Sequence, residues 1–152
     1  MPMIIAVIGA GSCSKEIYDI AEEAGKLIAM NGAVLITGGL GGVMEAASRG
    51  AQEEGGITVG ILPGFSKDEA NRYVDIPIAT GLSHARNAVI ARSADALIAI
   101  AGEYGTLSEI AIALKLGKPV IGIKTWDTIE GVIHVNTPAE AIKKISESIL
   151  NY

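Results

Sequence analysis

One stretch of the sequence decides the fold: Ala96–Thr106, which reads ALIAIAGEYGT. Its first five residues are all apolar, which is typical of a strand covered on both faces of a parallel sheet. A glycine-rich turn follows, and from Thr106 to Leu116 apolar residues recur at helical spacing. The stretch therefore predicts a buried strand, a glycine turn and a helix in direct succession, the repeating unit of parallel α/β folds.

The same alternation extends along the whole chain. Predicted strands lie at Met3–Ile8, Ala33–Thr37, Thr58–Leu62, Tyr73–Pro77, Ala96–Ile100, Val120–Ile123 and Val132–Val135. Predicted helices lie at Ser14–Met30, Gly41–Glu54, Ser83–Ser93, Thr106–Leu116 and Thr137–Leu150, and Pro63–Arg72 is polar enough for a loop or short helix. Strands separated by helices imply right-handed crossovers. We therefore expect a single α/β domain over residues 1–152, with a doubly wound, mostly parallel, Rossmann-like sheet.

Length, charge and cysteine content narrow the function. The chain has 152 residues, enough for one domain with a sizeable core. Its net charge of -5 argues against a nucleic-acid partner, because binding to a phosphate backbone relies on clustered Lys and Arg. The single cysteine, Cys13, can form neither an intrachain disulfide nor a cysteine-based zinc site. The cysteine content fits a reducing compartment, so we expect a cytoplasmic protein, and we expect no metal site. No apolar run approaches ~20 residues, so we expect no membrane partner.

Three predicted strands end in glycine-rich turns that open helices: Gly9–Ser14, Thr37–Gly42 and Gly102–Thr106. In an open α/β sheet such turns meet at the carboxyl edge, where ligands bind. Glycine lets the backbone approach a phosphate, and a helix N-terminus supplies free N–H groups. We expect a phosphorylated ligand to be bound by Gly9, Gly11, Ser12, Thr37, Gly38, Gly39, Gly41, Gly42, Met44, Gly102, Tyr104, Gly105 and Thr106. The alternative, that the glycines only make tight turns, carries equal weight for any single loop.

Two familiar nucleotide-binding motifs are not matched. In the first turn, Ser14 occupies the place of the third glycine of a dinucleotide-binding fingerprint. The second strand ends in Thr37 rather than in the acidic residue that would bind a ribose. No Gly-Lys-Ser/Thr follows any of the glycines, which argues against a P-loop.

Several short motifs together carry a family resemblance. They are Ser83-His84-Ala85-Arg86-Asn87, Ala94-Asp95-Ala96, the segment Gly102–Glu109 and the glycine motif Gly38–Met44. In this combination the chain resembles the LOG-like (lysine decarboxylase-like) Rossmann superfamily. It looks closest to the branch that contains molybdenum cofactor carrier proteins.

The resemblance implies two activities. Phosphoribohydrolases of the superfamily release the base from a nucleoside 5′-monophosphate and leave ribose 5-phosphate, whereas the carriers hold the phosphate of a pterin cofactor. By resemblance, Gly105 and Thr106 would hold the phosphate. Arg86 and Glu109 would form the essential charged pair, and would be the catalytic residues if the chain is an enzyme.

Two departures from the family pattern favour a carrier. The family's Pro-Gly-Gly is Ala101-Gly102-Glu103 here, and the Arg-Lys pair of the hydrolases is Arg86-Asn87, which removes a cation near the reacting sugar. We predict a binding or carrier protein for a phosphorylated heterocycle, either a nucleoside monophosphate or a molybdopterin-type cofactor, with no other cofactor required. A nucleoside-monophosphate phosphoribohydrolase is the alternative. A DprA-like DNA-processing module is disfavoured by the acidic charge.

Glu109 also has a purely structural interpretation. Thr106–Glu109 matches the capping-box pattern, as do Ser66–Glu69 and Thr137–Glu140, where no chemistry is expected. Spacing alone therefore makes Glu109 a helix cap, and only the resemblance makes it a site residue.

We also expect a homodimer or a higher symmetric assembly. The resemblance implies association through helices beside the pocket, and closed symmetric dimers are the commonest oligomers. The predicted helix Ser83–Ser93 would contribute Ala88, Val89 and Ile90. His84 is interpreted as a surface residue of that helix, although it could line the pocket.

Overall fold

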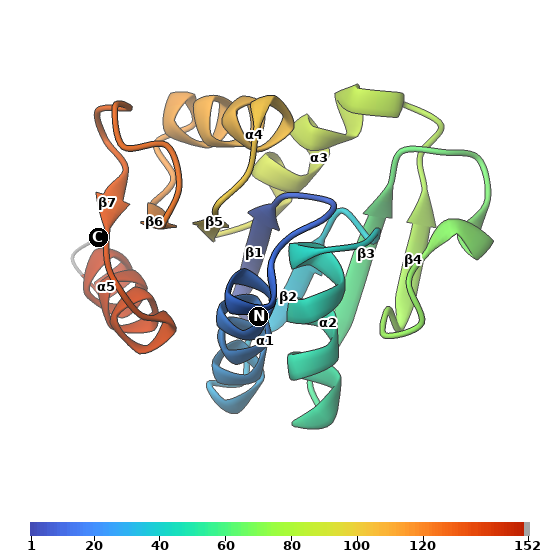
Figure 1. Ribbon diagram of the computed structural model, residues 1–152, viewed down its shortest axis with the longest axis horizontal. Coiled ribbons are helices and arrows are strands. Elements are labelled where there is room, and N and C mark those ends of the chain that lie inside the picture. The colour runs from blue at the N-terminus through green and yellow to red at the C-terminus, as the bar shows by residue number, and fades with distance from the viewer. Residues whose placement is uncertain (151–152) are drawn as a thin grey trace.

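The computed structural model describes residues 1–150, which form one seven-stranded sheet flanked by helices (Figure 1). The strands are β1 (Ile4–Gly9), β2 (Val34–Thr37), β3 (Thr58–Leu62), β4 (Ile76–Ala79), β5 (Ala96–Ile100), β6 (Val120–Ile123) and β7 (Ile133–His134). Their order is β4-β3-β2-β1-β5-β6-β7, and every pair is parallel. The expectation of a doubly wound α/β fold is confirmed.

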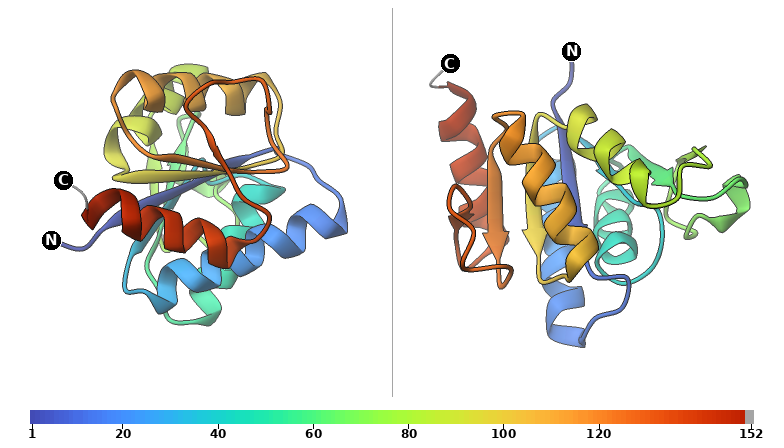
Figure 2. Two further views of the ribbon diagram at one scale, coloured as in Figure 1. Left: turned by 90° about the vertical axis from the view of Figure 1, so that its left-hand side faces the viewer. Right: turned by 90° about the horizontal axis from the view of Figure 1, so that it is seen from above.

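Helices cover both faces of the sheet (Figure 2). They are α1 (Lys15–Met30), α2 (Val43–Glu53), α3 (Arg86–Ser93), α4 (Tyr104–Lys115) and α5 (Pro138–Leu150), with 3₁₀ turns η1 (Lys67–Glu69) and η2 (Ser83–Ala85). One face of the sheet packs against α1, α2 and α5, and the other against α3 and α4. No helix within residues 1–150 is both long enough and apolar enough to span a membrane.

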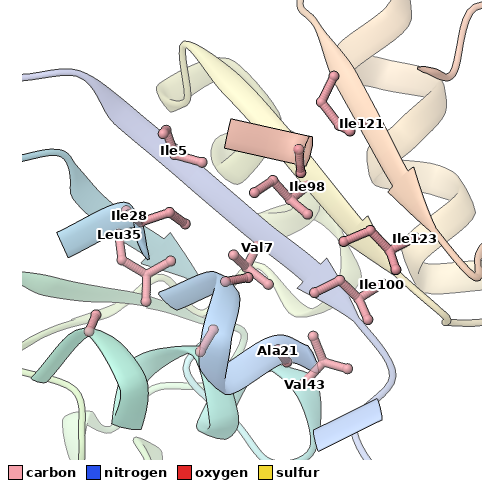
Figure 3. Close-up of a cluster of buried hydrophobic side chains, with 14 of the residues drawn as sticks. Ile5, Val7, Ala21, Ile28, Leu35, Val43, Ile98, Ile100, Ile121 and Ile123 are labelled. Carbon is pink, nitrogen blue, oxygen red and sulfur yellow. The ribbon is translucent and has the colours of Figure 1, made fainter. Parts of the chain in front are cut away.

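The side chains of successive residues in each central strand lie alternately in one and the other of two hydrophobic cores. Val7 of β1, Ile98 of β5 and Ile121 of β6 face the first core, between the sheet and helices α1, α2 and α5 (Figure 3). Their neighbours in sequence, such as Ile8 and Leu97, face the second core under α3 and α4. Burial on both faces explains why these strands are uniformly apolar in the sequence.

Helices α1 and α2 approach each other closely because glycine lies at their contact. A Cβ on Gly25 of α1 would stand 1.9 Å from the carbonyl oxygen of Ala47 in α2. A Cβ on Gly50 of α2 would stand 1.9 Å from the carbonyl oxygen of Glu22 in α1. The two backbones therefore touch, with no room for a side chain at either glycine.

The chain reverses its direction across the sheet between β1 and β5. From β1 it builds outward through β2 and β3 to β4, and from β5 it builds the other way through β6 to β7. The carboxyl ends of β1 and β5 are therefore the topological switch point, where such sheets bind ligands.

The predicted boundary of β4 was wrong by about three residues. Tyr73–Pro77 was expected to be a strand, but β4 begins only at Ile76. Asn71–Asp75 form a polar turn instead, in which Thr58 Oγ1 donates to the Tyr73 carbonyl and the Asp75 carboxylate accepts from the Thr58 amide. The predicted strand Val132–Val135 is shorter in the structure, where β7 spans Ile133–His134.

Three predicted helix starts also move. Gly42 has a φ of +62° and precedes α2, which therefore begins at Val43 rather than Gly41. Ser83 has a φ of +54°, so a 3₁₀ turn comes first and α3 begins at Arg86. Helix α4 begins two residues earlier than expected, at Tyr104.

Candidate phosphate-binding cavity

A cavity of about 450 Å³ lies at the switch point of the sheet. Its lining comes from the end of β1 and the following turn, from Gly38 and Met44 around the second glycine turn, from the start of α3, and from the first half of α4. The lining residues are Val7, Ile8, Gly9, Ala10, Gly11, Ser12, Gly38, Met44, His84, Arg86, Asn87, Glu103, Gly105, Thr106 and Glu109. This volume is within the range of small-molecule sites.

The structure brings most of the expected site residues together. The cavity is lined by Gly9, Gly11, Ser12, Gly38, Met44, Arg86, Gly105, Thr106 and Glu109. Six other expected residues are not part of its lining: Thr37, Gly39, Gly41, Gly42, Gly102 and Tyr104.

Several of these six residues shape the turns instead. The Thr37 hydroxyl accepts a hydrogen bond from the Gly39 amide and is fully buried. Gly102 has a φ of +97°, and a Cβ there would stand 2.2 Å from Thr106 Oγ1. Tyr104 is 80% exposed and its ring lies 6.0 Å from that of Trp126. For Thr37 and Gly102 the turn-forming interpretation describes the observed contacts, whereas Tyr104 lies at the surface beside Trp126.

Arg86 is a buried cation held by neutral acceptors. Its side chain comes from the start of α3 and the residue is only 9% exposed. Nε donates to the Ile61 carbonyl at 2.9 Å, Nη2 to the Gly38 carbonyl at 3.4 Å, and Nη1 to Asn87 Oδ1. Burial lowers the pKa of Arg86, and the attraction of Glu109 partly offsets this.

Asn87 links Arg86 to helix α4. It accepts from Arg86 through Oδ1 and donates through Nδ2 to Ser108 Oγ at 3.1 Å and to the Gly105 carbonyl at 3.5 Å. Ser108 in turn donates to the Gly105 carbonyl at 2.6 Å. The amide therefore sets the position of the guanidinium relative to the first turn of α4.

Glu109 is not a helix cap. Because α4 begins at Tyr104, with Glu103 before it and no side-chain cap, Glu109 lies in the second turn of the helix. The residue is 6% exposed and lines the cavity. The capping-box interpretation of Thr106–Glu109 was therefore wrong, whereas the Thr137 hydroxyl does cap α5 by accepting from the Glu140 amide.

The electrostatics of Glu109 are dominated by burial. Loss of hydration raises its pKa to about 8, and the attraction of Arg86 only partly opposes this. The ion pairs within residues 1–150, defined by a nitrogen–oxygen distance of 4.0 Å or less, include neither Glu109 nor Arg86. The expected charged pair shares a cavity, but its two members do not form an ion pair at this distance.

The first turn of α4 presents unpaired backbone donors beside Arg86. The first hydrogen bond within α4 runs from the Leu107 amide to the Glu103 carbonyl, which leaves the amides of Tyr104, Gly105 and Thr106 outside the helical ladder. Trp126 Nε1 donates to the same Glu103 carbonyl at 3.1 Å and anchors this turn. Such an array of amides at a helix N-terminus favours an anion.

Two residues other than glycine adopt a left-handed backbone conformation beside the cavity. Ser83, with φ of +54°, precedes His84, and Ala101, with φ of +50°, precedes the turn before α4. Backbone strain of this kind is frequent at binding sites.

Six lining residues were missed as site members: Val7, Ile8, Ala10, His84, Asn87 and Glu103. Asn87 and Glu103 were noted only as departures from a family pattern, and His84 was assigned to the helix surface; all three line the cavity. The adjacency of Asn87 to Arg86 was the available signal. No cluster of three or more His, Cys, Asp or Glu side chains suited to a metal occurs among the described residues.

Comparison with known proteins assigns the family. A profile of the SLOG cluster4 family matches residues 2–148. The chain belongs to this family. An uncharacterized protein from Archaeoglobus fulgidus is 55% identical over 148 residues, which cover 97% of both chains.

Solved structures place the chain beside carriers. The molybdenum cofactor binding protein from Rippkaea orientalis is 39% identical, with a TM-score of 0.93 over 98% of both chains. The molybdenum cofactor carrier protein from Chlamydomonas reinhardtii is 38% identical, with a TM-score of 0.88 over 97% of this chain and 99% of that one. The expected membership of the LOG-like Rossmann branch is confirmed.

More distant relatives include hydrolases. A cytokinin riboside 5′-monophosphate phosphoribohydrolase from Mycobacterium tuberculosis is 32% identical over 127 residues, 77% of this chain and 67% of that protein. A probable enzyme of this kind from Oryza sativa is 33% identical over 106 residues, and the chain spans about half its length. DNA processing protein A from Streptococcus pneumoniae, at 21% identity and a TM-score of 0.77, shares the fold alone.

Proposed function

We propose that this protein binds a phosphorylated heterocycle of the molybdopterin class and carries it without cleaving it. The observation that carries the proposal is the buried guanidinium of Arg86, which has only neutral acceptors among the described residues. A buried charge is costly unless an opposite charge compensates it. An anionic ligand in the cavity would supply that charge.

The phosphate end of the ligand would lie between Arg86 and α4. Three of the five N–H donors of Arg86 are used by the protein, which leaves two for phosphate oxygens. The free amides of Gly105 and Thr106 would complete the phosphate site, since both residues line the cavity. Charge-assisted hydrogen bonds of this kind are among the strongest in proteins.

The heterocycle would lie toward the first and second glycine turns. A Cβ on Gly11 would meet only the Met44 methyl group at 4.0 Å, so this wall of the cavity is open. Met44 lines the same wall, and a thioether adapts its shape to a flat ring. Ser12 offers a hydroxyl for polar atoms of the ring.

Two features favour a carrier over a phosphoribohydrolase. Asn87 places a neutral amide, committed to Arg86 and Ser108, where the resembling hydrolases have a lysine. Glu109, with a pKa of about 8, is mostly uncharged at pH 7. An uncharged carboxyl group stabilises little of the positive charge that develops on a ribose during cleavage.

The proposal is tested by titrating the protein with inorganic phosphate and with GMP. Trp126 is the only tryptophan of the sequence and touches the turn before α4, so its fluorescence reports on the site. We expect Arg86→Gln to weaken both probes by about 10- to 100-fold, the loss of one charged hydrogen bond. Arg92→Gln, on the exposed side of the same helix, is the matched control and should bind as wild type does. Equal binding by Arg86→Gln and wild type would refute the site.

Turnover separates carrier from hydrolase. Base release from a panel of nucleoside 5′-monophosphates should not exceed the rate without protein. Release well above that rate, abolished by Glu109→Gln, would assign the hydrolase instead. Mass spectrometry of any small molecule that copurifies would identify the ligand directly.

The symmetric oligomer stays a prediction, but one of the three residues expected at its interface cannot contribute. Ile90 is fully buried within the protein's own core, so it cannot contribute to an interface. Ala88 and Val89 are half-buried. Light scattering at micromolar protein should give at least twice the monomer mass.

A further inference from the structure

Glu109 is a buried acid that the phosphate site leaves unused. Its carboxyl group lines the cavity and the residue is 94% removed from solvent. No hydrogen bond from the described part of the chain reaches this carboxyl group, and no cation lies within 4.0 Å of it. The side chain is therefore a polar group that lines the cavity without a hydrogen-bond partner among the described residues.

The surroundings of Glu109 do not compensate a negative charge. Arg86, from α3, directs three donors at Ile61, Gly38 and Asn87 instead. The other ionisable groups that line the cavity are His84, from η2, and Glu103, from the turn before α4. A second negative charge beside a bound phosphate would repel it.

We propose that Glu109 binds the ligand as a neutral carboxylic acid, donating a hydrogen bond to an acceptor atom of the heterocycle. The acceptor would be a ring nitrogen or an exocyclic carbonyl oxygen, both of which pterins and purines carry. This inference rests on the proposed function and adds the recognition of the ring to that of the phosphate. A protonated carboxyl group, like a hydroxyl or an amide, can donate a hydrogen bond without adding charge beside an anion, whereas the ionised carboxylate can only accept.

The proposal makes ligand affinity depend on the proton of Glu109. Because the acid form binds, affinity is fully present below the pKa of about 8 and falls as the pH rises above it. The phosphate monoester itself is already a dianion well below that pH, since its second pKa is about 6. We expect GMP to bind about tenfold more weakly for each pH unit above 8.

Two substitutions of Glu109 separate the donor from the charge. Glu109→Gln keeps a donor at all pH values, so GMP affinity should stay near that of wild type at pH 7 and lose its fall above pH 8. Glu109→Met has a similar shape and no donor, so GMP should bind about tenfold more weakly at pH 7. Both variants should bind inorganic phosphate at pH 7 as wild type does, because phosphate has no ring to recognise.

Two further variants serve as controls for the pH profile. Glu130→Gln changes an exposed carboxylate outside the cavity and should keep the fall above pH 8. His84→Gln should also keep it, and its loss in that variant would assign the titration to the imidazole and overturn the proposal. If wild type bound neither GMP nor phosphate, the proposed function itself would fail. If GMP bound but Gln and Met variants did not differ, only the role of Glu109 would fail.

A second readout needs no ligand. In protein labelled with ¹³C at glutamate carboxyl groups, wild type should show one resonance that titrates near pH 8 and is missing from Glu109→Gln. A Glu109 resonance that titrates near 4.5, the ordinary value for glutamate, would overturn the proposal.

Discussion

The guanidinium of Arg86 lies directly against Gly38: a Cβ on residue 38 would stand 2.7 Å from Arg86 Nη2 and 2.7 Å from the sulfur of Met44. Glycine at this position therefore leaves space for a side chain from another element, and its own turn is not what excludes a Cβ. The absence of a side chain on Gly38 lets Arg86 reach the cavity from the start of α3.

Gly38→Ala should lower the affinity for phosphate while changing the free energy of unfolding less. The added methyl group must displace the ends of two flexible side chains, which moves the guanidinium away from its position beside α4. We expect an affinity loss of about tenfold for inorganic phosphate, equivalent to one hydrogen bond to a charged group. Calorimetric titration measures it. Unchanged affinity would show that the position of Arg86 does not limit binding.

Gly25→Ala should have the opposite effect: it should lower the free energy of unfolding and leave the affinity for phosphate unchanged. Its Cβ would meet backbone atoms of α2, which cannot rotate away, so α1 and α2 must separate. Overpacking of this kind lowers the free energy of unfolding by about 1–3 kcal/mol. Urea denaturation measures the loss, and phosphate affinity of the folded variant should equal that of wild type. A variant as stable as wild type would contradict the close helix contact.

Asn87→Asp should abolish most anion binding while preserving shape. The new carboxylate would stand beside Arg86 Nη1 and form the ion pair that the wild-type site lacks. Since the compensating charge would then come from the protein, phosphate affinity should fall by more than about tenfold. Ser108→Ala removes one partner of Asn87 without adding charge and should have a much smaller effect. Similar losses in both variants would argue against a charge effect.

Glu109→Gln should stabilise the protein at alkaline pH. A carboxyl group with a pKa of about 8 when folded and 4.5 when unfolded imposes no penalty below pH 4.5. The penalty then grows with rising pH, to roughly 4–5 kcal/mol above pH 8 at about 1.4 kcal/mol for each pKa unit. The variant should therefore unfold at higher urea concentration than wild type at pH 8, with the difference vanishing near pH 4.5. A constant difference across this range would contradict the pKa of Glu109.

Much of the fold was predictable because its strands are buried on both faces. Short uniform apolar runs such as Ala96–Ile100 favour buried strands, and the helices between them imply a parallel sheet. The error at β4 has a long-range cause, since the turn before it is held by Thr58, fifteen or more residues earlier. The start of α4 depends on the positive φ angles of Ala101 and Gly102, and a left-handed alanine has no sequence signature.

The location of the cavity was predictable from the sequence, but the hydrogen-bond pairings within it were not. Glycine turns at strand ends must meet at one edge of the sheet, which brought Gly9, Gly38 and Gly105 to one cavity. The partners of Asn87 lie 18 and 21 residues away in sequence, beyond any local pattern. Whether Arg86 and Glu109 form an ion pair depends on the carbonyls of Ile61 and Gly38, which compete for the guanidinium. The spacing of residues along the chain does not reveal this competition.

The adjacency of β1 and β5 has a consequence for the newly made chain. The cavity needs residues from the first turn, near Gly9, and from α4, near Glu109, and these are brought together only when β1 pairs with β5. At about 5–20 residues per second, the ribosome needs several seconds to synthesise the segment between them. The cavity is therefore incomplete during the first two thirds of translation. A ligand of the kind proposed would therefore bind only after β1 and β5 have paired, and it would contact two parts of the chain that are made at different times.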